Sequence, residues 1–484
     1  MGIELMKRRS VVGAFGGICL LLTGFAGRSS AQGAAAPLPF RERIGVSTHL
    51  PTGQDAAAQG ARAQELRLLA EAGVRWIRRD FFWHEIEPAR GTFHFVPYDQ
   101  IVDEAAEWGI SFLALLAYGN PWASERGEAT GDPHYPPDDP ADFARYAARV
   151  VAHFSGRVRF FEIWNEENVG VRFWKPTIGG DPQAYGRLLS ETFQAIEGVD
   201  PEARVVFGGT FYPHLGVPGT SAFVGRVFRF HPDIGEAFDI FAYHPYRYPF
   251  TAPEVEAPVG MPGGVLLQES LASTIARVRE ILARRGGNHP LWITELGWHT
   301  AGPVGFGARG VCPLDQARYL VRSAVIAIAG GVERFFWYTY GDGPRSAHDQ
   351  EDAFGLVGWD EDPTDATPPE RKPAYFALET MLDLLGDAVA VTKTSLAEGL
   401  FAFTFQAPAR VTVVVWQPAE GAREVTLPLS LPCPRWVGRD LFGGDIPVAT
   451  GRDGVSVTVS PSPIYLICPL PSPALTASPR GEAP

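Results

Sequence analysis

Short apolar segments alternate eight times with amphipathic segments along residues 43–388, and this alternation constrains the fold more than any other feature. The apolar segments have the length and the aromatic or β-branched content of buried strands, whereas the amphipathic segments repeat apolar residues with a helical period. Eight strand–helix units are typical of a (β/α)8 TIM barrel. A doubly wound open sheet is the alternative that the same pattern allows.

The units follow each other along the chain, with long proline-rich loops after the third, sixth and eighth predicted strands, at residues 118–137, 245–268 and 341–371, where we expect substrate specificity to lie. The predicted strands are residues 43–47, 74–78, 110–117, 158–164, 204–207, 238–243, 291–294 and 332–338. The predicted helices are residues 58–72, 98–108, 142–154, 182–196, 222–230, 271–284, 313–329 and 372–385.

The pattern changes after residue 388. Residues 389–468 contain β-forming segments separated by proline, glycine and aspartate, with no helix of useful length. This favours a C-terminal antiparallel β-sandwich, for which bracing the barrel is the expected role and glycan binding the alternative. Residues 469–484 are rich in proline, serine and alanine, and we expect a disordered tail.

The N-terminal residues 1–31 have the composition of a signal peptide. Lys7, Arg8 and Arg9 precede an apolar run, and small residues follow it before a linker at residues 32–42. Arg8 and Arg9 also allow a twin-arginine signal. No later stretch is long and apolar enough to span a membrane. We therefore expect a secreted or periplasmic protein.

Charge and cysteine content narrow the classes of partner. The formal net charge is −13, and it becomes more negative without the basic N-terminal segment, which argues against nucleic acid or an anionic membrane as partner. An exported protein can form a disulfide, and Cys433 and Cys468 are the plausible pair because both lie in the C-terminal region. Nothing resembles a CxxC metal site, and the sequence does not indicate an oligomeric state.

Two glutamates stand at the carboxyl ends of predicted strands, which face one shared pocket in a barrel. Glu166 follows Trp164 and Asn165, and Glu295 directly follows the seventh predicted strand. Glycosidic bond cleavage needs two carboxyl groups, one acting as an acid and one as a nucleophile or base. A single glutamate at a strand end is as often structural, but two in this arrangement favour catalysis.

These residues resemble known motifs. Trp164-Asn165-Glu166 and Ile293-Thr294-Glu295-Leu296-Gly297-Trp298 look like the acid/base and nucleophile motifs of clan A retaining glycoside hydrolases. The resemblance covers residues 43–386 and is strongest to family 39, whose barrel is also followed by a β-sandwich; family 5 is its neighbour. It implies a double displacement on a β-linked glycan or oligosaccharide, without metal or other cofactor. Glu166 would be the acid/base, and Glu295 would form the covalent glycosyl-enzyme.

The resemblance also implies a set of substrate-binding residues. Arg78 occupies the place of an arginine near the nucleophile, His244 and Tyr246 match an active-site histidine and tyrosine, and Trp337 matches a platform under the sugar. Asn165 would bind the 2-hydroxyl group. The partner would be a poly- or oligosaccharide.

Other aromatic residues at strand ends complete the prediction. His49, Tyr118 and Trp298 are further candidates for sugar contact, with Tyr338 as the neighbour that could replace Trp337. Trp83, Trp122, Trp174 and Trp298 fit sugar subsites or loop packing equally well. One departure concerns Glu167, which stands where the clan often has proline and leaves the choice of acid open.

Some signals favour other chemistry only weakly. Residues 305–310 match GxGxxG but do not connect a strand to a helix in a tight turn, so we do not predict a dinucleotide site. A solvated loop explains the acidic residues after the eighth strand better than a calcium-binding site does; they are Asp342, Asp349, Glu351 and Asp352. A catalytically inactive carbohydrate-binding barrel, serving exopolysaccharide handling, is the functional alternative. The presence of both carboxylates with their supporting residues argues against it.

Overall fold

The computed structural model describes residues 37–470, apart from 213–218, 248–249, 260–266, 286, 305–307, 361–366, 397–398, 430–432 and 434. The predicted signal peptide, the start of the linker, residues 471–484 and part of the GxGxxG segment lie outside the described residues. Among the described residues, no helix combines the length and apolar character needed to cross a membrane.

Eight parallel strands close into a barrel, as the alternation predicted, so the open-sheet alternative is excluded. The strands are β1 (Ile44–Ser47), β2 (Trp76–Phe82), β3 (Ser111–Ala117), β4 (Phe160–Asn165), β5 (Arg204–Phe211), β6 (Phe241–His244), β9 (Leu291–Leu296) and β12 (Arg334–Trp337). Their order around the barrel is β1-β12-β9-β6-β5-β4-β3-β2.

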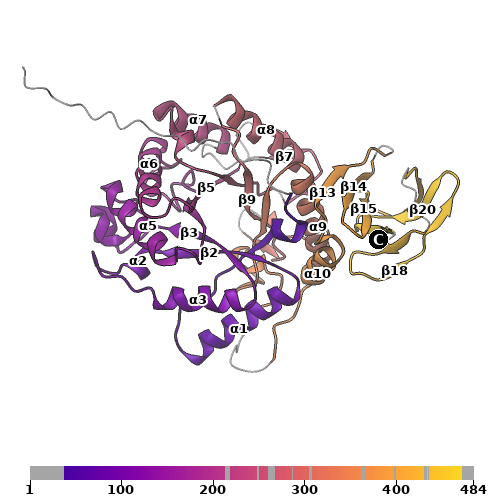
Figure 1. Cartoon of the computed structure of the whole chain (residues 1–484), viewed down its shortest axis with the longest axis horizontal. Helices are drawn as coiled ribbons and strands as arrows, with labels where there is room; N and C mark the ends of the chain where they lie inside the picture. Colours follow the sequence, from indigo (N-terminus) through magenta and orange to yellow (C-terminus); the bar gives the residue numbers. More distant parts are fainter. Residues whose placement is uncertain are drawn as a thin grey trace, which may run out of the picture. The chain divides into compact units, whose positions relative to one another are not determined.

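Helices surround these strands (Figure 1). They are α1 (Ala56–Glu71), α3 (Val96–Glu107), α5 (Pro140–Phe154), α6 (Pro182–Val199), α7 (Thr220–Phe230), α8 (Leu271–Arg284), α9 (Pro313–Ala329) and α10 (Pro373–Leu385). Side-chain caps define several starts: Asp139 and Asp181 accept backbone N–H groups, and a proline follows each at the first helical position. Smaller elements, among them α2 (Trp83–Ile86), α4 (Glu125–Thr130), β7 (Ala257–Val259), β8 (Leu267–Glu269), β10 (Pro303–Val304) and β11 (Ala308–Arg309), lie in the loops.

Strand β5 runs four residues beyond its predicted end. Gly208 and Gly209 suggest a break in the sequence, yet both are strand residues. A Cβ atom on Gly208 would lie 2.5 Å from Oε2 of Glu167, and one on Gly209 would lie 2.1 Å from Nε2 of His244. Because Gly208 and Gly209 have no side chain, Glu167 and His244 can lie close to β5, and the two glycines do not end the strand.

The lower part of the barrel interior is filled by large apolar side chains. They are Trp76, Leu113, Val206, Ile240, Ala242, Trp292 and Phe336. The guanidinium group of Arg334 lies 4.0 Å from the ring centre of Trp76 and 4.6 Å from that of Trp292, so even this charged group is enclosed by aromatic rings. With this end closed by packing, polar chemistry is confined to the carboxyl ends of the strands.

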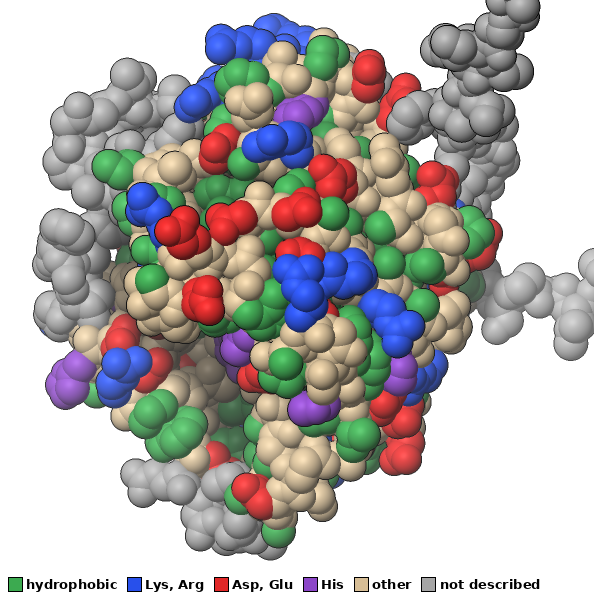
Figure 2. Space-filling view, turned by 90° about the vertical axis from the view of Figure 1, so that its left-hand side faces the viewer, with side chains coloured by type: hydrophobic (Ala, Val, Ile, Leu, Met, Phe, Trp, Pro, Cys, Tyr) green, Lys and Arg blue, Asp and Glu red, His purple; other side chains and the backbone are tan. Residues whose placement is uncertain are grey.

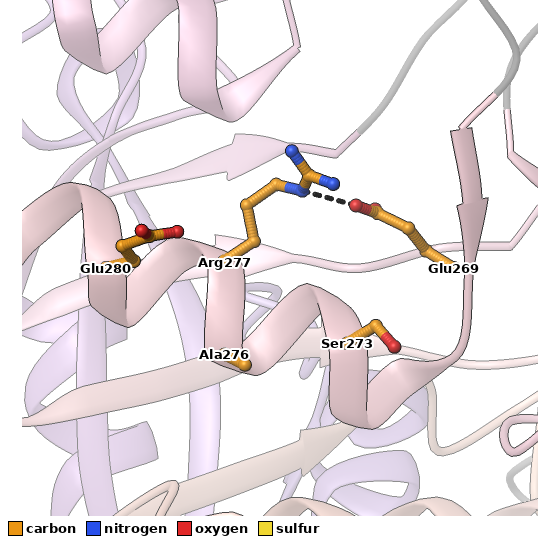
Figure 3. Close-up of a pocket in the computed structure, with 5 residues that line it drawn as sticks. All are labelled: Glu269, Ser273, Ala276, Arg277 and Glu280. Carbon is orange, nitrogen blue, oxygen red and sulfur yellow. Dashed lines mark hydrogen bonds and ion pairs between the residues drawn. The ribbon is translucent and has the colours of Figure 1, made fainter.

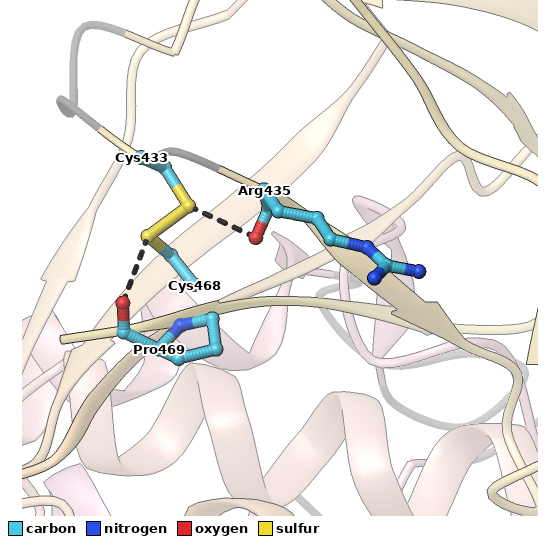
Figure 4. The surroundings of a disulfide bond; sticks show 4 residues. All are labelled: Cys433, Arg435, Cys468 and Pro469. Carbon is cyan, nitrogen blue, oxygen red and sulfur yellow. Dashed lines mark hydrogen bonds between the residues drawn. A yellow bond between two sulfur atoms is a disulfide. The ribbon is translucent and has the colours of Figure 1, made fainter. Parts of the chain in front are cut away.

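Two antiparallel sheets form the C-terminal region, as predicted. One has six strands in the order β13-β14-β15-β21-β17-β18, and the other has three in the order β16-β20-β19. Their bounds are β13 (Ala390–Lys393), β14 (Phe401–Gln406), β15 (Arg410–Trp416), β16 (Arg423–Leu427), β17 (Val437–Arg439), β18 (Asp445–Ile446), β19 (Ala449–Gly451), β20 (Gly454–Val459) and β21 (Ile464–Pro469). The predicted disulfide joins Cys433 to Cys468 (Figure 4), while Cys312 is free and exposed.

A buried polar cluster links the sandwich to the barrel. Glu254, in the loop after β6, accepts a hydrogen bond from Nε of Arg322 on α9 at 2.5 Å. The indole N–H of Trp416 on β15 donates to the same carboxylate oxygen of Glu254. The sandwich thereby contacts a loop that leaves the functional end of the barrel.

Acidic, basic and apolar side chains are interspersed on the face drawn in Figure 2. The negative net charge is therefore not gathered into one acidic patch on that face.

Candidate active site

The two predicted carboxylates lie together at the carboxyl ends of β4 and β9. One oxygen of Glu166, one oxygen of Glu295 and a ring nitrogen of His244 all lie within 4.8 Å of one another. Glu166 is 6% exposed and Glu295 is 7% exposed, so both carboxyl groups are almost removed from water yet accessible at one edge. The barrel thus brings together residues that are more than one hundred positions apart in the sequence.

Glu166 reaches this place through an unusual backbone. Trp164 has a φ angle of 71° and Glu166 one of 46°, both in the left-handed region that residues other than glycine rarely adopt. The backbone N–H of Glu166 donates to the carbonyl of Gly209 on β5 at 3.1 Å, which ties the end of β4 to the next strand. These turns break the simple in–out alternation at the strand end and aim Glu166 at the barrel mouth.

Arg78 on β2 holds the carboxyl group of Glu295. Its Nη1 donates to Oε1 of Glu295 at 2.5 Å, and its Nη2 donates to Oδ1 of Asn165 at 2.8 Å. The third donor, Nε, binds Oε2 of Glu162 at 2.5 Å. A guanidinium group held at three points fixes the Glu295 carboxylate in position.

Glu162 belongs to the hydrogen-bond network of the site but is not among the residues predicted from the sequence. It is fully buried inside β4, where it binds Arg78 and accepts a hydrogen bond from Thr294 Oγ1 at 2.8 Å. A signal existed, because Glu162 is a charged residue within an otherwise apolar strand, and buried charges are paired.

His244 connects this network to Glu166. Its Nδ1 lies 2.8 Å from Oε1 of Glu166, and its Nε2 lies 3.0 Å from the hydroxyl oxygen of Thr294. Since the Thr294 hydroxyl donates to Glu162, its oxygen accepts from Nε2–H, and Nδ1 is left with the lone pair. Burial lowers the pKa of His244 to about 4, so the ring is neutral at ordinary pH. A neutral His244 with a lone pair on Nδ1 requires that Glu166 be the protonated partner.

The two carboxyl groups differ in their hydrogen-bond partners. Burial raises the pKa of Glu166 and of Glu295 above the ordinary value. At Glu295 this is opposed by Arg78 and by the hydroxyl of Tyr246, which donates to Oε2 at 2.9 Å. At Glu166 it is opposed by the contact with His244, whose ring is neutral, and by the charge of Arg172. The surroundings therefore favour an ionised Glu295 and a protonated Glu166, which is how one site holds an acid and a nucleophile.

Aromatic rings line the mouth above the carboxyl groups. Tyr118 stacks on Phe173 with ring centres 5.6 Å apart, and Tyr246 lies 6.3 Å from the ring of Tyr338. His49, whose side chain is 59% exposed, lies 5.9 Å from the ring of Tyr338. Of the predicted substrate residues, Arg78, Asn165, His244, Tyr246, Tyr118 and His49 thus surround one mouth.

Trp337 and Trp298 are not at this mouth, which corrects the expectation that they contact sugar. Both are 0% exposed, and they stack on each other with ring centres 6.1 Å apart. Side chains alternate along β12, so Phe336 faces the barrel interior and Trp337 faces the helices. The residue that reaches the mouth is therefore the next one, Tyr338.

The loop tryptophans divide in the same way. Trp83 and Trp174 are 0% and 1% exposed and belong to the packing between barrel and helices, whereas Trp122 is half-buried under the guanidinium group of Arg90 at 4.6 Å. Loop packing accounts for the first two.

Glu167 points away from the mouth. It is 0% exposed, its two carboxyl oxygens have no hydrogen-bond partner among the described residues, and it occupies the space above Gly208 near the hydroxyl of Tyr185. Burial raises its pKa well above the ordinary value. Glu167 therefore lies against α6 as a neutral group, and Glu166 is the carboxyl group that faces His244 and Glu295.

The acidic loop after β12 carries its own basic partners. Asp342 pairs with Lys372, Asp349 and Asp352 with Arg345, and Glu351 with Arg172. These ion pairs use the carboxylates that a calcium site would need.

A second concavity lies beside α8 and is lined by Glu269, Ser273, Ala276, Arg277 and Glu280 (Figure 3). Arg277 donates to Glu269, which also accepts from Tyr212. The hydrogen bonds and ion pairs described for these lining residues do not include Glu166 or Glu295. We assign no function to this concavity beside α8.

Comparison with known proteins places this geometry in context. The family model described as Glyco_hydro_42, beta-galactosidase, matches residues 55–122, which include β2 and β3. No curated protein matches the sequence significantly.

Solved structures resemble the chain over nearly its whole length. A family 39 glycoside hydrolase from Bacteroides cellulosilyticus WH2 has a TM-score of 0.69 at 21% identity, covering 89% of this chain and 82% of its own. A monomeric beta-xylosidase from Caulobacter crescentus CB15 has a TM-score of 0.61 at 18% identity, covering 90% and 97%. A family 30 endoxylanase from Clostridium papyrosolvens C71 has a TM-score of 0.59 at 11% identity, covering 90% and 98%. At these identities the matches establish the fold, which agrees with the resemblance to clan A and family 39 found in the motifs.

Proposed function

We propose that this protein is a retaining glycoside hydrolase that cleaves a β-linked glycan or oligosaccharide. The observation that carries the proposal is the approach of Glu166 and Glu295, whose nearest oxygens lie within 4.8 Å. Retaining enzymes hold their two carboxyl groups about 5–5.5 Å apart, whereas inverting enzymes leave about 6.5–9.5 Å for a water molecule. Oxygens this close leave little room for an intervening water molecule, which supports direct attack by a carboxylate.

In the first step, an oxygen of Glu295 attacks the anomeric carbon, and the bond to the leaving oxygen breaks. Glu166 gives its proton to that oxygen, so the aglycone departs as a neutral alcohol. His244 prepares this transfer, because its Nδ1 lone pair holds the Glu166 proton until the leaving oxygen competes for it.

In the second step, a water molecule attacks the anomeric carbon of the glycosyl-enzyme. Glu166, now ionised, takes a proton from this water, and the bond from carbon to Glu295 breaks. The sugar leaves with its original configuration, and both carboxyl groups return to their starting protonation states.

Arg78 and Tyr246 stabilise the negative charge on Glu295 before attack and again when it departs. Asn165 lies beside Glu166 with its Oδ1 bound to Arg78, so its amide N–H2 can donate to the sugar. We assign it to the 2-hydroxyl group, where a hydrogen bond strengthens as positive charge grows on the ring.

The two roles can be separated with azide and an activated aryl β-glycoside. Glu295→Ala should lose hydrolysis and, with azide, form the α-glycosyl azide, because azide replaces the nucleophile in a single displacement. Glu166→Ala should instead form the β-glycosyl azide, because the glycosyl-enzyme still forms and azide attacks it. NMR spectroscopy of the products distinguishes the two.

The proposal fails if Glu295→Ala hydrolyses its substrate normally or if the wild-type product has inverted configuration. A screen of aryl β-glycosides and polysaccharides tests the alternative of an inactive carbohydrate-binding barrel. Binding without hydrolysis across that screen would favour the alternative.

We also propose that the protein is secreted or periplasmic. The basic and apolar pattern of residues 1–31 supports this, and the disulfide between Cys433 and Cys468 suits an oxidising compartment. Fractionation of cells expressing the full chain, with mass analysis of the mature N-terminus, tests it.

A further inference from the structure

An ion pair joins loops from opposite sides of the barrel. Arg172 lies in the loop after β4, and Glu351 lies in the 3-10 turn Glu351–Ala353 after β12. Nη2 of Arg172 is 3.3 Å from Oε2 of Glu351. In the closed order of strands, β4 and β12 are four steps apart in either direction, so these loops start from opposite points of the ring.

The ion pair lies near the reacting groups. Backbone hydrogen bonds from Val169 to Glu166 and from Arg172 to Val169 fold this segment into a tight turn beside the acid. Burial opposes the charge of Arg172, yet the carboxylates of Glu351 and Glu166 hold its pKa above the ordinary value. The pKa of Tyr338 is raised first by burial and then by Glu295 and Glu351. Arg172 and Glu351 are therefore both close enough to the floor of the mouth to affect its charges.

Packing and hydrogen bonds support both ends. The guanidinium carbon of Arg172 lies 4.6 Å above the ring centre of Phe173, which stacks on Tyr118. On the other side, the side chain of Gln350 donates to Oε1 of Glu351 at 3.3 Å, and the backbone N–H of Glu351 donates to Asp349. The side chains of Arg172 and Glu351 are 55% and 37% exposed, so the pair is solvent-accessible, and the neighbouring groups on each side hold it in place.

We propose that the Arg172–Glu351 pair closes the mouth to long chains, so that the enzyme removes units from chain ends. This inference rests on the proposed glycosidase function and deepens it by naming the form of the substrate. A polysaccharide that runs across the mouth between the β4 and β12 loops would have to displace the pair. A short oligosaccharide or a chain end enters without doing so.

The test compares long and short substrates. An aryl β-glycoside accepted by the wild type serves as the short substrate, and end-labelled oligosaccharides of the same sugar, with about six units, serve as the long one. Wild type should release terminal units only. Arg172→Ala and Glu351→Ala should produce internal fragments, and the ratio of kcat/KM for long over short substrates should rise about tenfold.

Effects that do not depend on chain length cancel in the ratio of kcat/KM for the long over the short substrate. Loss of Arg172 also alters the charge near Glu166, but that change affects both substrates alike. Arg284→Ala is the matched control, because Arg284 pairs with Glu280 on the exposed surface of α8 and should leave the product pattern unchanged. The double variant Arg172→Glu with Glu351→Arg restores an ion pair and should restore terminal release.

Internal cleavage by the wild type would overturn the inference, as would an unchanged product pattern in both single variants. If the wild type hydrolyses neither substrate, the proposed function itself fails. The short aryl glycoside separates these cases because it does not extend across the mouth.

Discussion

Nδ1 of His244 lies 2.8 Å from Oε1 of Glu166, and the other ring nitrogen of His244 is committed to Thr294. The imidazole therefore receives the Glu166 proton in a hydrogen bond and does not supply one. This relationship sets the resting protonation of the site together with the burial of both residues, because the chain of donors runs from Glu166 through His244 and Thr294 to Glu162.

The first prediction concerns His244→Phe, which keeps a ring but removes the acceptor. Neutral His244 stabilises protonated Glu166, so its loss should lower the pKa of Glu166 and move the alkaline limb of the kcat/KM profile to lower pH. We expect a shift of roughly one pH unit, corresponding to one hydrogen bond of about 1.4 kcal/mol. The profile is measured with an aryl glycoside. A shift to higher pH would mean that His244 is charged and paired with ionised Glu166.

The second prediction concerns Tyr246→Phe. Its hydroxyl donates to Glu295, so removal should raise the pKa of that carboxyl group and move the acidic limb of the profile to higher pH. A hydrogen bond to a charged group contributes about 1.5–3 kcal/mol, so kcat/KM should fall roughly 10- to 150-fold at the optimum. The control is Tyr243→Phe on the same strand, whose hydroxyl points into the surrounding packing. An unchanged acidic limb in Tyr246→Phe would contradict the role.

The fold and the catalytic pair were predictable because each follows from a local rule. Alternation of strands and helices specifies the barrel, and carboxylates at strand ends then share one mouth whatever the loops do. Glu166 and Glu295 could therefore be identified without knowing any contact between the strands. Glu162 and Thr294 lie within strands, and their role appears only when β4 and β9 are brought to the same interior.

The register at a strand end was not predictable. Trp337 and Tyr338 are adjacent aromatic residues, and a shift of one residue decides which one faces the mouth. The left-handed backbone at Trp164 and Glu166 likewise lies where the end of β4 pairs with β5, at the hydrogen bond from Glu166 to the carbonyl of Gly209. The Arg172–Glu351 pair joins loops that are far apart in the sequence. The periodicity of apolar residues does not predict a contact between such loops.

The third prediction concerns Glu167, the buried carboxyl group next to the acid. Its pKa is raised in the folded protein, whereas the unfolded chain should titrate near 4.3. The folded state then binds the proton more tightly. Its contribution to stability is fully present below pH 4.3 and is lost as the pH rises toward the folded pKa, by about 1.4 kcal/mol per pH unit.

Glu167→Gln removes this titration while keeping the shape. The variant should match the wild type in unfolding free energy near pH 4 and exceed it increasingly as the pH rises toward 7. Urea unfolding at several pH values measures the difference. Glu167→Ala is the comparison, because a cavity should destabilise it at every pH. A difference between Gln and wild type that does not grow with pH would show that Glu167 is not held neutral.

The last prediction concerns the buried cluster that joins the sandwich to the barrel. Glu254 is 8% exposed and accepts from both Arg322 and Trp416. Arg322→Met should leave a buried carboxylate without its cation and cost about 3–5 kcal/mol in unfolding free energy. Glu254→Gln combined with Arg322→Met should cost less than the sum of the single changes, because no unpaired charge remains. Arg318→Met on the same helix is the control, since its partners Asp315 and Ser462 are more exposed. Additive effects in the cycle would show that Glu254 and Arg322 do not act as a pair, and the sandwich would then brace the loop through apolar contacts alone.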